Sequence, residues 1–233
     1  MNNSLTLKAY QLILTKSATA FFMLFVCNAF VSATPQVKTI HIATEEWKNA
    51  AEKDLSGTYF DITRTIFSPQ GYELKVSFVP YKRALLMVEK QEVDALFGTY
   101  SAEEENKPFL VTPNLPLDGE RTIAIFKKSS VSRWEGEKSL ANRKVAWILG
   151  YDYHNSLNVD VNFQEVRSAH SGLSMLKAGR IDFYIDAASD VAPLLNETKD
   201  HYQQETLLIN NLYMAFANTL KGKLLAKIYD EEF

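Results

Sequence analysis

A helix-to-strand segment that occurs twice constrains the fold of this chain most strongly. In the first copy, residues 80–100, apolar residues recur at helical spacing and then give way, after a charged turn, to a short continuous apolar run. This change of period is typical of a helix that leads into a strand buried on both faces. The same pattern returns at residues 172–187, where Asp182 aligns with Asp94 of the first copy. Two such units predict two similar lobes.

The rest of the chain also alternates between strand-like and helix-like stretches. The predicted strands are residues 39–44, 72–79, 93–97, 121–127, 145–149, 162–166, 181–185 and 207–216. The other predicted helices are residues 58–67, 190–196, with Pro193 in the first turn, and 220–228. Alternating strands and helices predict an α/β fold, with a mostly parallel sheet flanked by helices in each lobe.

The first 33 residues are expected to be a signal peptide. Lys8 and Lys16 precede an apolar run at residues 18–31, and small residues follow up to Ala33, where we expect cleavage. A retained membrane anchor is the alternative, but the run is shorter than the ~20 residues that span a bilayer. We therefore expect a periplasmic protein. The expected domains are lobe 1 at residues 34–120, lobe 2 at 121–212 and a return to lobe 1 at 213–233.

Composition excludes several classes of function for the mature chain. The single cysteine, Cys27, lies in the predicted signal peptide, so disulfides, thiol catalysis and cysteine-ligated metals are excluded. Without Lys8 and Lys16 the chain has 23 basic and 28 acidic side chains, which argues against nucleic acid as a partner. No phosphate-loop, dinucleotide or serine-nucleophile motif occurs, and the four histidines are not at metal-ligand spacing. We expect a binding protein without a cofactor rather than an enzyme.

The C-terminus carries an unfavourable charge pattern. Asp230, Glu231 and Glu232 stand at the end of the last predicted helix, where the helix dipole favours cations. The last turn is therefore expected to fray, unless the chain given is a fragment.

From Ile40 to Phe233 the chain resembles the family 3 extracellular solute-binding proteins, the periplasmic receptors of polar amino-acid ABC transporters. The resemblance rests on the pattern D-x-x-G-x-x-x-D at residues 54–61, on the Gly-Arg-hydrophobic-Asp sequence at residues 179–182, and on the last helix. It implies a two-lobed periplasmic binding protein-like fold of type II, with a ligand cleft between the lobes. It also implies a small polar solute as ligand and an inner-membrane permease as partner, and we expect a monomer.

The chain departs from this family at the carboxylate clamp. The family's Thr-x-x-Arg after the third strand is replaced at residues 101–106 by SAEEEN, which has no arginine. A substitute is Arg83, in a Pro-Tyr-Lys-Arg-Ala motif that resembles a divergent branch of the family, because a guanidinium presents a planar donor fork. The alternative for Arg83 is a surface ion pair with Glu46 or Glu89.

Several further residues are expected to face the ligand. Trp47 and Glu45 directly follow the first strand, and ligands of α/β sheets gather outside such strand ends. Residues 150–153 lie where the resemblance implies a strand-to-helix turn, whose backbone N–H groups favour anions. Asp186, one residue before the position of the family's ammonium-binding acid, is a candidate for that role. Packing within a lobe is the alternative for each aromatic residue. The complete set of expected ligand contacts is Glu45, Trp47, Tyr59, Tyr81, Arg83, Thr99, Tyr100, Gly150, Tyr151, Tyr153 and Asp186.

The expected function is capture of an amino-acid-like solute or a small organic anion between the lobes, for delivery to an ABC-type permease. Closure would hinge near residues 117–122 and 212–216. The alternatives are a ligand-sensing module for a membrane receptor and, less favoured, a dehydratase-like enzyme on the same fold.

Overall fold

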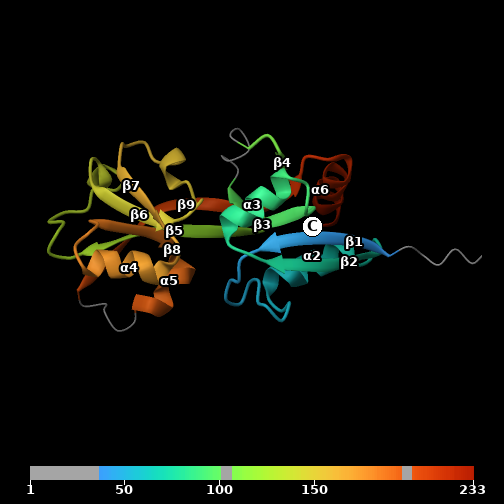
Figure 1. Ribbon diagram of the computed structural model, residues 1–233, viewed down its shortest axis with the longest axis horizontal. Helices are drawn as coiled ribbons and strands as arrows, with labels where there is room; N and C mark the ends of the chain where they lie inside the picture. The colour runs from blue at the N-terminus through green and yellow to red at the C-terminus, as the bar shows by residue number, and fades with distance from the viewer. Residues whose placement is uncertain (1–36, 101–106, 196–200) are drawn as a thin grey trace, which may run out of the picture. The chain divides into compact units, whose positions relative to one another are not determined.

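The computed structural model describes residues 37–100, 107–195 and 201–233, and Lys38–Phe233 form one unit (Figure 1). The predicted signal peptide and the acidic segment at residues 101–106 lie outside the described residues. In the part of the chain that is described, no helix combines the length and the apolar character needed to cross a bilayer.

The first half of the unit is built on three parallel strands in the order β2-β1-β3. These strands are β1 (Lys38–Thr44), β2 (Tyr72–Phe78) and β3 (Ala95–Tyr100), and the helices between them are α2 (Thr58–Phe67) and α3 (Tyr81–Glu89). As predicted, β3 is buried on both faces: Ala95, Leu96 and Phe97 are all buried. Burying an apolar side chain of this kind contributes about 1.5–3 kcal/mol to stability, so this run anchors the half.

The second half repeats this arrangement, with its parallel strands in the order β7-β6-β8. Its strands are β6 (Lys144–Ile148), β7 (Asn162–Val166) and β8 (Phe183–Ala187). Its helices are α4 (Ala169–Lys177) and α5 (Ala188–Leu195), with short 3-10 turns η2 (Lys138–Leu140) and η3 (Tyr153–Asn155). Trp147 of β6 and Phe183 of β8 are fully buried in its core.

Two long antiparallel strands join the halves. The strand β9 (Tyr202–Ala217) pairs with β3 through its C-terminal part and with β5 (Asp118–Lys127) through the rest, and β5 in turn pairs with β8. The result is one sheet in the order β2-β1-β3-β9-β5-β8-β6-β7, with the short β4 (Leu110–Val111) beside β9 (Figure 1). After β9, helix α6 (Leu220–Glu232) contacts α2 of the first half. The lobe boundaries at residues 120 and 212 remain predictions.

The aspartate that recurs in the two repeated segments makes the same pair of hydrogen bonds in both halves. The Asp94 carboxylate accepts a hydrogen bond from the backbone N–H of His41 (2.8 Å), and the Asp94 N–H donates to the His41 carbonyl (2.8 Å). Asp182 makes the same pair of bonds with Lys144, at 3.0 and 2.7 Å. Each aspartate therefore fastens the start of the third parallel strand of its half to the first one, which explains its recurrence.

Replacing this aspartate should destabilise the fold. Asp94→Ala leaves the His41 N–H without its acceptor, so the free energy of unfolding in urea should fall by about 1–3 kcal/mol. Asp182→Ala should cost a similar amount. Asp94→Asn keeps an acceptor oxygen and loses only the ion pair with Lys221, which is partly exposed and contributes little. Equal losses for the Asn and Ala variants would contradict this role.

The structure corrects the expected position of Pro193. Helix α5 begins at Ala188, directly after β8, so Pro193 lies inside the helix rather than in its first turn. A proline there has no N–H to donate to the preceding turn. The early start follows from β8, which runs without a loop into the helix.

The expected fraying of the C-terminal turn is also wrong. Helix α6 continues to Glu232, and Asp230 is held by a neighbouring loop. Its carboxylate accepts hydrogen bonds from the backbone N–H groups of Asn114 (2.7 Å) and Leu115 (3.2 Å) and from the Asn114 side-chain amide (2.8 Å). These donors satisfy the negative charge that the helix dipole disfavours.

Candidate functional site

Three cavities lie where the parallel strands of both halves end. Their volumes are about 380, 230 and 20 Å³, and all three have Trp47 in their walls, so we treat them together as the cleft. The widest is lined by residues that follow the carboxyl ends of four strands: Glu45 after β1, Tyr151 after β6, Arg167 after β7 and Asp190 after β8. This is where α/β sheets bind their ligands.

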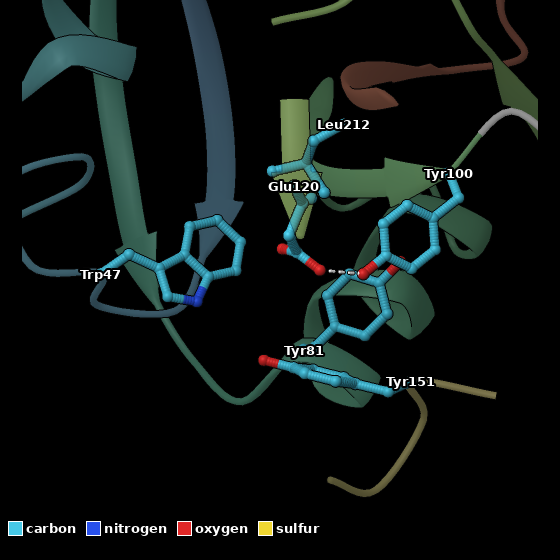
Figure 2. Close-up of a pocket in the computed structure, with 7 residues that line it drawn as sticks. Trp47, Tyr81, Tyr100, Glu120, Tyr151 and Leu212 are labelled. Carbon is cyan, nitrogen blue, oxygen red and sulfur yellow. Dashed lines mark hydrogen bonds between the residues drawn. The ribbon is translucent and has the colours of Figure 1, made fainter. Parts of the chain in front are cut away.

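Aromatic rings form much of the cleft wall. Trp47 meets Tyr59 edge to face at a centroid distance of 6.1 Å, and Tyr81 meets Tyr151 in the same way at 5.6 Å. Figure 2 shows Trp47 on one side of the Glu120 carboxylate and the tyrosines on the other. Such rings present an apolar face together with a polar hydroxyl tip.

Tyrosine hydroxyls pair with carboxylates throughout the cleft. The pairs are Tyr59 with Asp118 (3.0 Å), Tyr100 with Glu120 (drawn in Figure 2), Tyr151 with Glu45 (3.3 Å) and Tyr184 with Asp186. In each pair the hydroxyl donates and the carboxylate accepts. Burial and the neighbouring acids raise the pKa of the tyrosines, which keeps them protonated as donors.

Four carboxyl groups of the cleft have raised pKa values. Burial raises the pKa of Asp186 to about 7, opposed by the hydrogen bond from Tyr184 and reinforced by the negative charge of Asp190. Burial likewise raises the pKa of Glu45, Glu120 and Asp190. The charge of Asp190 adds to the rise at both glutamates. The negative charge of Asp190 therefore contributes to the raised pKa of each of the other three acids.

The structure brings most of the predicted site residues together. Seven of them line the cleft: Glu45, Trp47, Tyr59, Tyr81, Tyr100, Tyr151 and Asp186. Tyr153 lies behind this wall, with its ring 5.8 Å from that of Tyr151 and 6.3 Å from that of Tyr100. Thr99 is fully buried in β3 and lines none of the three cavities. Contact with a ligand remains a prediction for all of them.

Arg83 does not stand in the cleft, which corrects its expected place as a carboxylate clamp. Its guanidinium lies 3.8 Å from the carboxylate of Glu92 and is half exposed. The buried face of α3 carries Tyr81, Ala84, Leu85 and Val88, and Arg83 projects from the opposite side.

The expected anion cradle at the start of η3 is also corrected. The backbone N–H of Gly150 already donates to the Glu165 carboxylate at 2.7 Å. The helical segment that follows, η3, has only three residues, too few to present a row of free N–H groups.

Four acids of the cleft were not among the predicted ligand contacts: Glu46, Asp118, Glu120 and Asp190. Asp118 and Glu120 begin β5, in a stretch whose prolines indicate only a crossing between lobes. Asp190 stands in the first turn of α5, where an acid suits any helix start. Position is the signal that could have indicated Asp190, because it follows the carboxyl end of the parallel strand β8 as Glu45 follows that of β1.

Comparison with known proteins shows the fold. No protein-family model and no curated protein matches the sequence. Among solved structures, the substrate binding protein of an amino acid ABC transporter aligns with a TM-score of 0.65 at 15% identity, over 83% of this chain and 90% of that one. Arginine-bound truncated ArgBP from T. maritima gives 0.63 at 14% identity, over 83% and 93%. The GluR0 ligand binding core complexed with L-glutamate gives 0.66 at 10% identity, over 83% and 91%. These likenesses confirm the predicted two-lobed α/β fold.

Proposed function

We propose that this protein is a solute-binding protein that holds a small polar molecule in the cleft. The observation that carries the proposal is the cleft itself, where strand ends of both halves place polar groups and aromatic rings around one space. A concave site with aromatic walls and a few converging polar groups is the usual form of a small-molecule site. The shared fold supports the proposal, since the proteins with which it aligns include substrate-binding proteins of amino acid ABC transporters.

We infer binding rather than catalysis. The carboxyl groups accept hydrogen bonds from tyrosines whose pKa values are raised by burial and by the neighbouring acids, so these tyrosines serve as donors rather than as bases. A binding protein of this fold closes its two halves around the solute. With the predicted signal peptide removed, the protein would act in the periplasm and deliver its solute to an ABC-type permease.

A ligand should stabilise the folded chain. A compound at 100 times its Kd adds about 2.7 kcal/mol to the free energy of unfolding, which raises the melting temperature by several degrees. The measurement is a thermal-shift screen of residues 34–233 against amines, amino acids, organic acids and neutral polar compounds, with hits measured by calorimetry.

Trp47→Ala provides the control for this screen. Because Trp47 lies in the wall of all three cavities, its loss should weaken a true cleft ligand. If no compound of any charge class raises the melting temperature, or if hits bind Trp47→Ala unchanged, the proposed cleft function is wrong.

A further inference from the structure

We propose that the solute is an organic amine without a carboxylate group, held with its ammonium beside Asp190. This inference rests on the proposed function of the cleft and narrows the class of molecule that it takes. It differs from the amino-acid-like or anionic solute expected from the sequence.

The charge of the cleft is the first argument. Among the residues that line it, the acids are Glu45, Glu46, Asp118, Glu120, Asp186 and Asp190, whereas the cations are Lys48 and Arg167. Lys48 and Arg167 are both exposed, as are the acids Glu46 and Asp118. The other four acids, Glu45, Glu120, Asp186 and Asp190, are partly or fully buried. Because the less exposed charged groups are all acids, the cavity focuses a negative potential inward.

The four partly or fully buried acids form no ion pair with the described residues. Within residues 37–100, 107–195 and 201–233, no ion pair involves Glu45, Glu120, Asp186 or Asp190. Among the described residues, the one side chain that donates to Asp190 is the Ser189 hydroxyl, at 3.3 Å. Burial is the main cause of the raised pKa values of the other three acids, and the negative charge of Asp190 adds to the rise at each of them. An ammonium beside Asp190 would place a positive charge near all four acids, which would favour their ionised forms.

The aromatic walls are an independent argument for the same ligand. Trp47 is shared by all three cavities, and Tyr59, Tyr81, Tyr100 and Tyr151 line one or more of them. A cation is attracted to the face of an aromatic ring, most strongly where water is excluded. Carboxylates combined with aromatic faces form a site suited to alkylammonium groups, which have both a charge and an apolar chain.

The structure provides little for a ligand carboxylate. Arg83 lies outside the cleft, paired with Glu92. At the start of α4, the backbone N–H of Ser171 already donates to the Ser168 hydroxyl. The two cations that line the cleft, Lys48 and Arg167, are exposed to solvent, where an ion pair contributes little.

The geometry also favours an organic cation over a metal ion. No group of three or more histidines, cysteines, aspartates or glutamates in the described part of the chain converges closely enough to hold a metal. The acids are spread along a space of several hundred Å³, a size that fits a small organic molecule.

Matched pairs of compounds test the inference. Calorimetry would compare 1,4-diaminobutane with ornithine and agmatine with arginine, since each pair differs only by a carboxylate, and would include butanedioate as the anionic analogue. Each amine should bind at least tenfold more tightly than its amino acid, and butanedioate should not bind. An amino acid that binds as tightly as its amine, or binding of butanedioate alone, overturns the amine inference and leaves the cleft function intact. Binding by no compound of any charge class overturns both.

Two variants locate the ammonium. Asp190→Asn should weaken binding of the better amine at least tenfold, and Glu120→Gln should weaken it in the same direction while keeping an acceptor for the Tyr100 hydroxyl. Arg83→Ala is the control and should leave the Kd unchanged. Circular dichroism establishes which variants are folded. If folded Asp190→Asn binds the amine as tightly as the wild type, the placement beside Asp190 is wrong. If Asp190→Asn does not fold, Glu120→Gln decides instead: amine binding as tight as that of the wild type overturns the proposal.

Discussion

The Asp186→Asn variant is expected to be more stable than the wild-type chain at pH 8, by a margin that shrinks as the pH falls toward 5. Asp186 is 1% exposed, and its pKa is raised from 3.8 to about 7, chiefly by burial. Above that pH the folded chain must bury a carboxylate that lies near the charges of Asp190 and Glu120. Asparagine removes this charge at almost constant shape.

The hydrogen bonds of Asp186 can be kept in the variant. The carboxylate accepts from the Tyr184 hydroxyl through one oxygen and from the Ala187 N–H through the other, at 2.9 Å. The asparagine oxygen can still accept from Ala187, while its amide donates to the Tyr184 oxygen, because a hydroxyl is both donor and acceptor. The substitution therefore keeps one hydrogen bond to Ala187 and one to Tyr184, with the direction of the second reversed.

The sign of the pH effect follows from proton binding. Between the unfolded pKa near 3.8 and the folded value of about 7, the folded wild type binds more protons than the unfolded chain, so its stability falls as the pH rises. Three pKa units correspond to roughly 4 kcal/mol at pH 8. Glu45, Glu120 and Asp190 have raised pKa values as well. Asp186→Asn should therefore reduce the slope of the unfolding free energy against pH without removing it.

Urea unfolding at pH 5, 6, 7 and 8 measures this slope. Tyr184→Phe is the matched variant with the opposite expectation, because losing the donor raises the Asp186 pKa further and steepens the decline. A wild-type stability that does not change from pH 5 to pH 8, or an Asp186→Asn slope equal to that of the wild type, would contradict the assignment.

Local signals were sufficient to predict most of the fold. Helix α2 was expected at residues 58–67 and lies at Thr58–Phe67, because Gly57 precedes it and a turn signal at residues 69–71 ends it. The repeated aspartates were also found from the sequence, since each belongs to a local helix–turn–strand pattern. Their shared bond to the first strand could not be predicted, because that bond joins residues 53 positions apart in one half.

The error over Arg83 was avoidable from the sequence. Successive residues of a helix are about 100° apart, so Arg83 lies roughly 200° around the axis from Tyr81, whereas Ala84, Leu85 and Val88 stay near Tyr81. The apolar pattern already placed Arg83 on the solvent side.

Asp190 was missed for a different reason. An acid in the first turn of a helix has a sufficient local explanation, and its interaction with Glu45 and Glu120 depends on how β1, β5 and β8 meet in space. No pattern within one segment contains that information.

Gly98→Ala should both destabilise the fold and disturb the cleft. Gly98 has a φ of +93°, in the left-handed region, and lies at the register shift between Phe97 and Thr99. A Cβ there would lie 2.5 Å from the tip of the Trp47 ring. The backbone conformation costs about 1–2 kcal/mol for a residue with a side chain, and the overlap adds about 1–3 kcal/mol. Because Trp47 lines all three cavities, its displacement should also weaken ligand binding.

Gly71→Ala is the matched control, because Gly71 has a φ of +78° and nothing within 4 Å of a new Cβ. It should show only the backbone cost and bind ligand normally, so the difference between the two variants in urea unfolding measures the contact with Trp47. A double-mutant cycle of Gly98→Ala with Trp47→Ala then tests whether that difference comes from the contact with the Trp47 ring. With Trp47→Ala in place, the Gly98→Ala substitution should cost no more than Gly71→Ala, because the clashing ring is gone. Additive losses would mean that the strain lies in the bulge of β3 and that Trp47 is not positioned by Gly98.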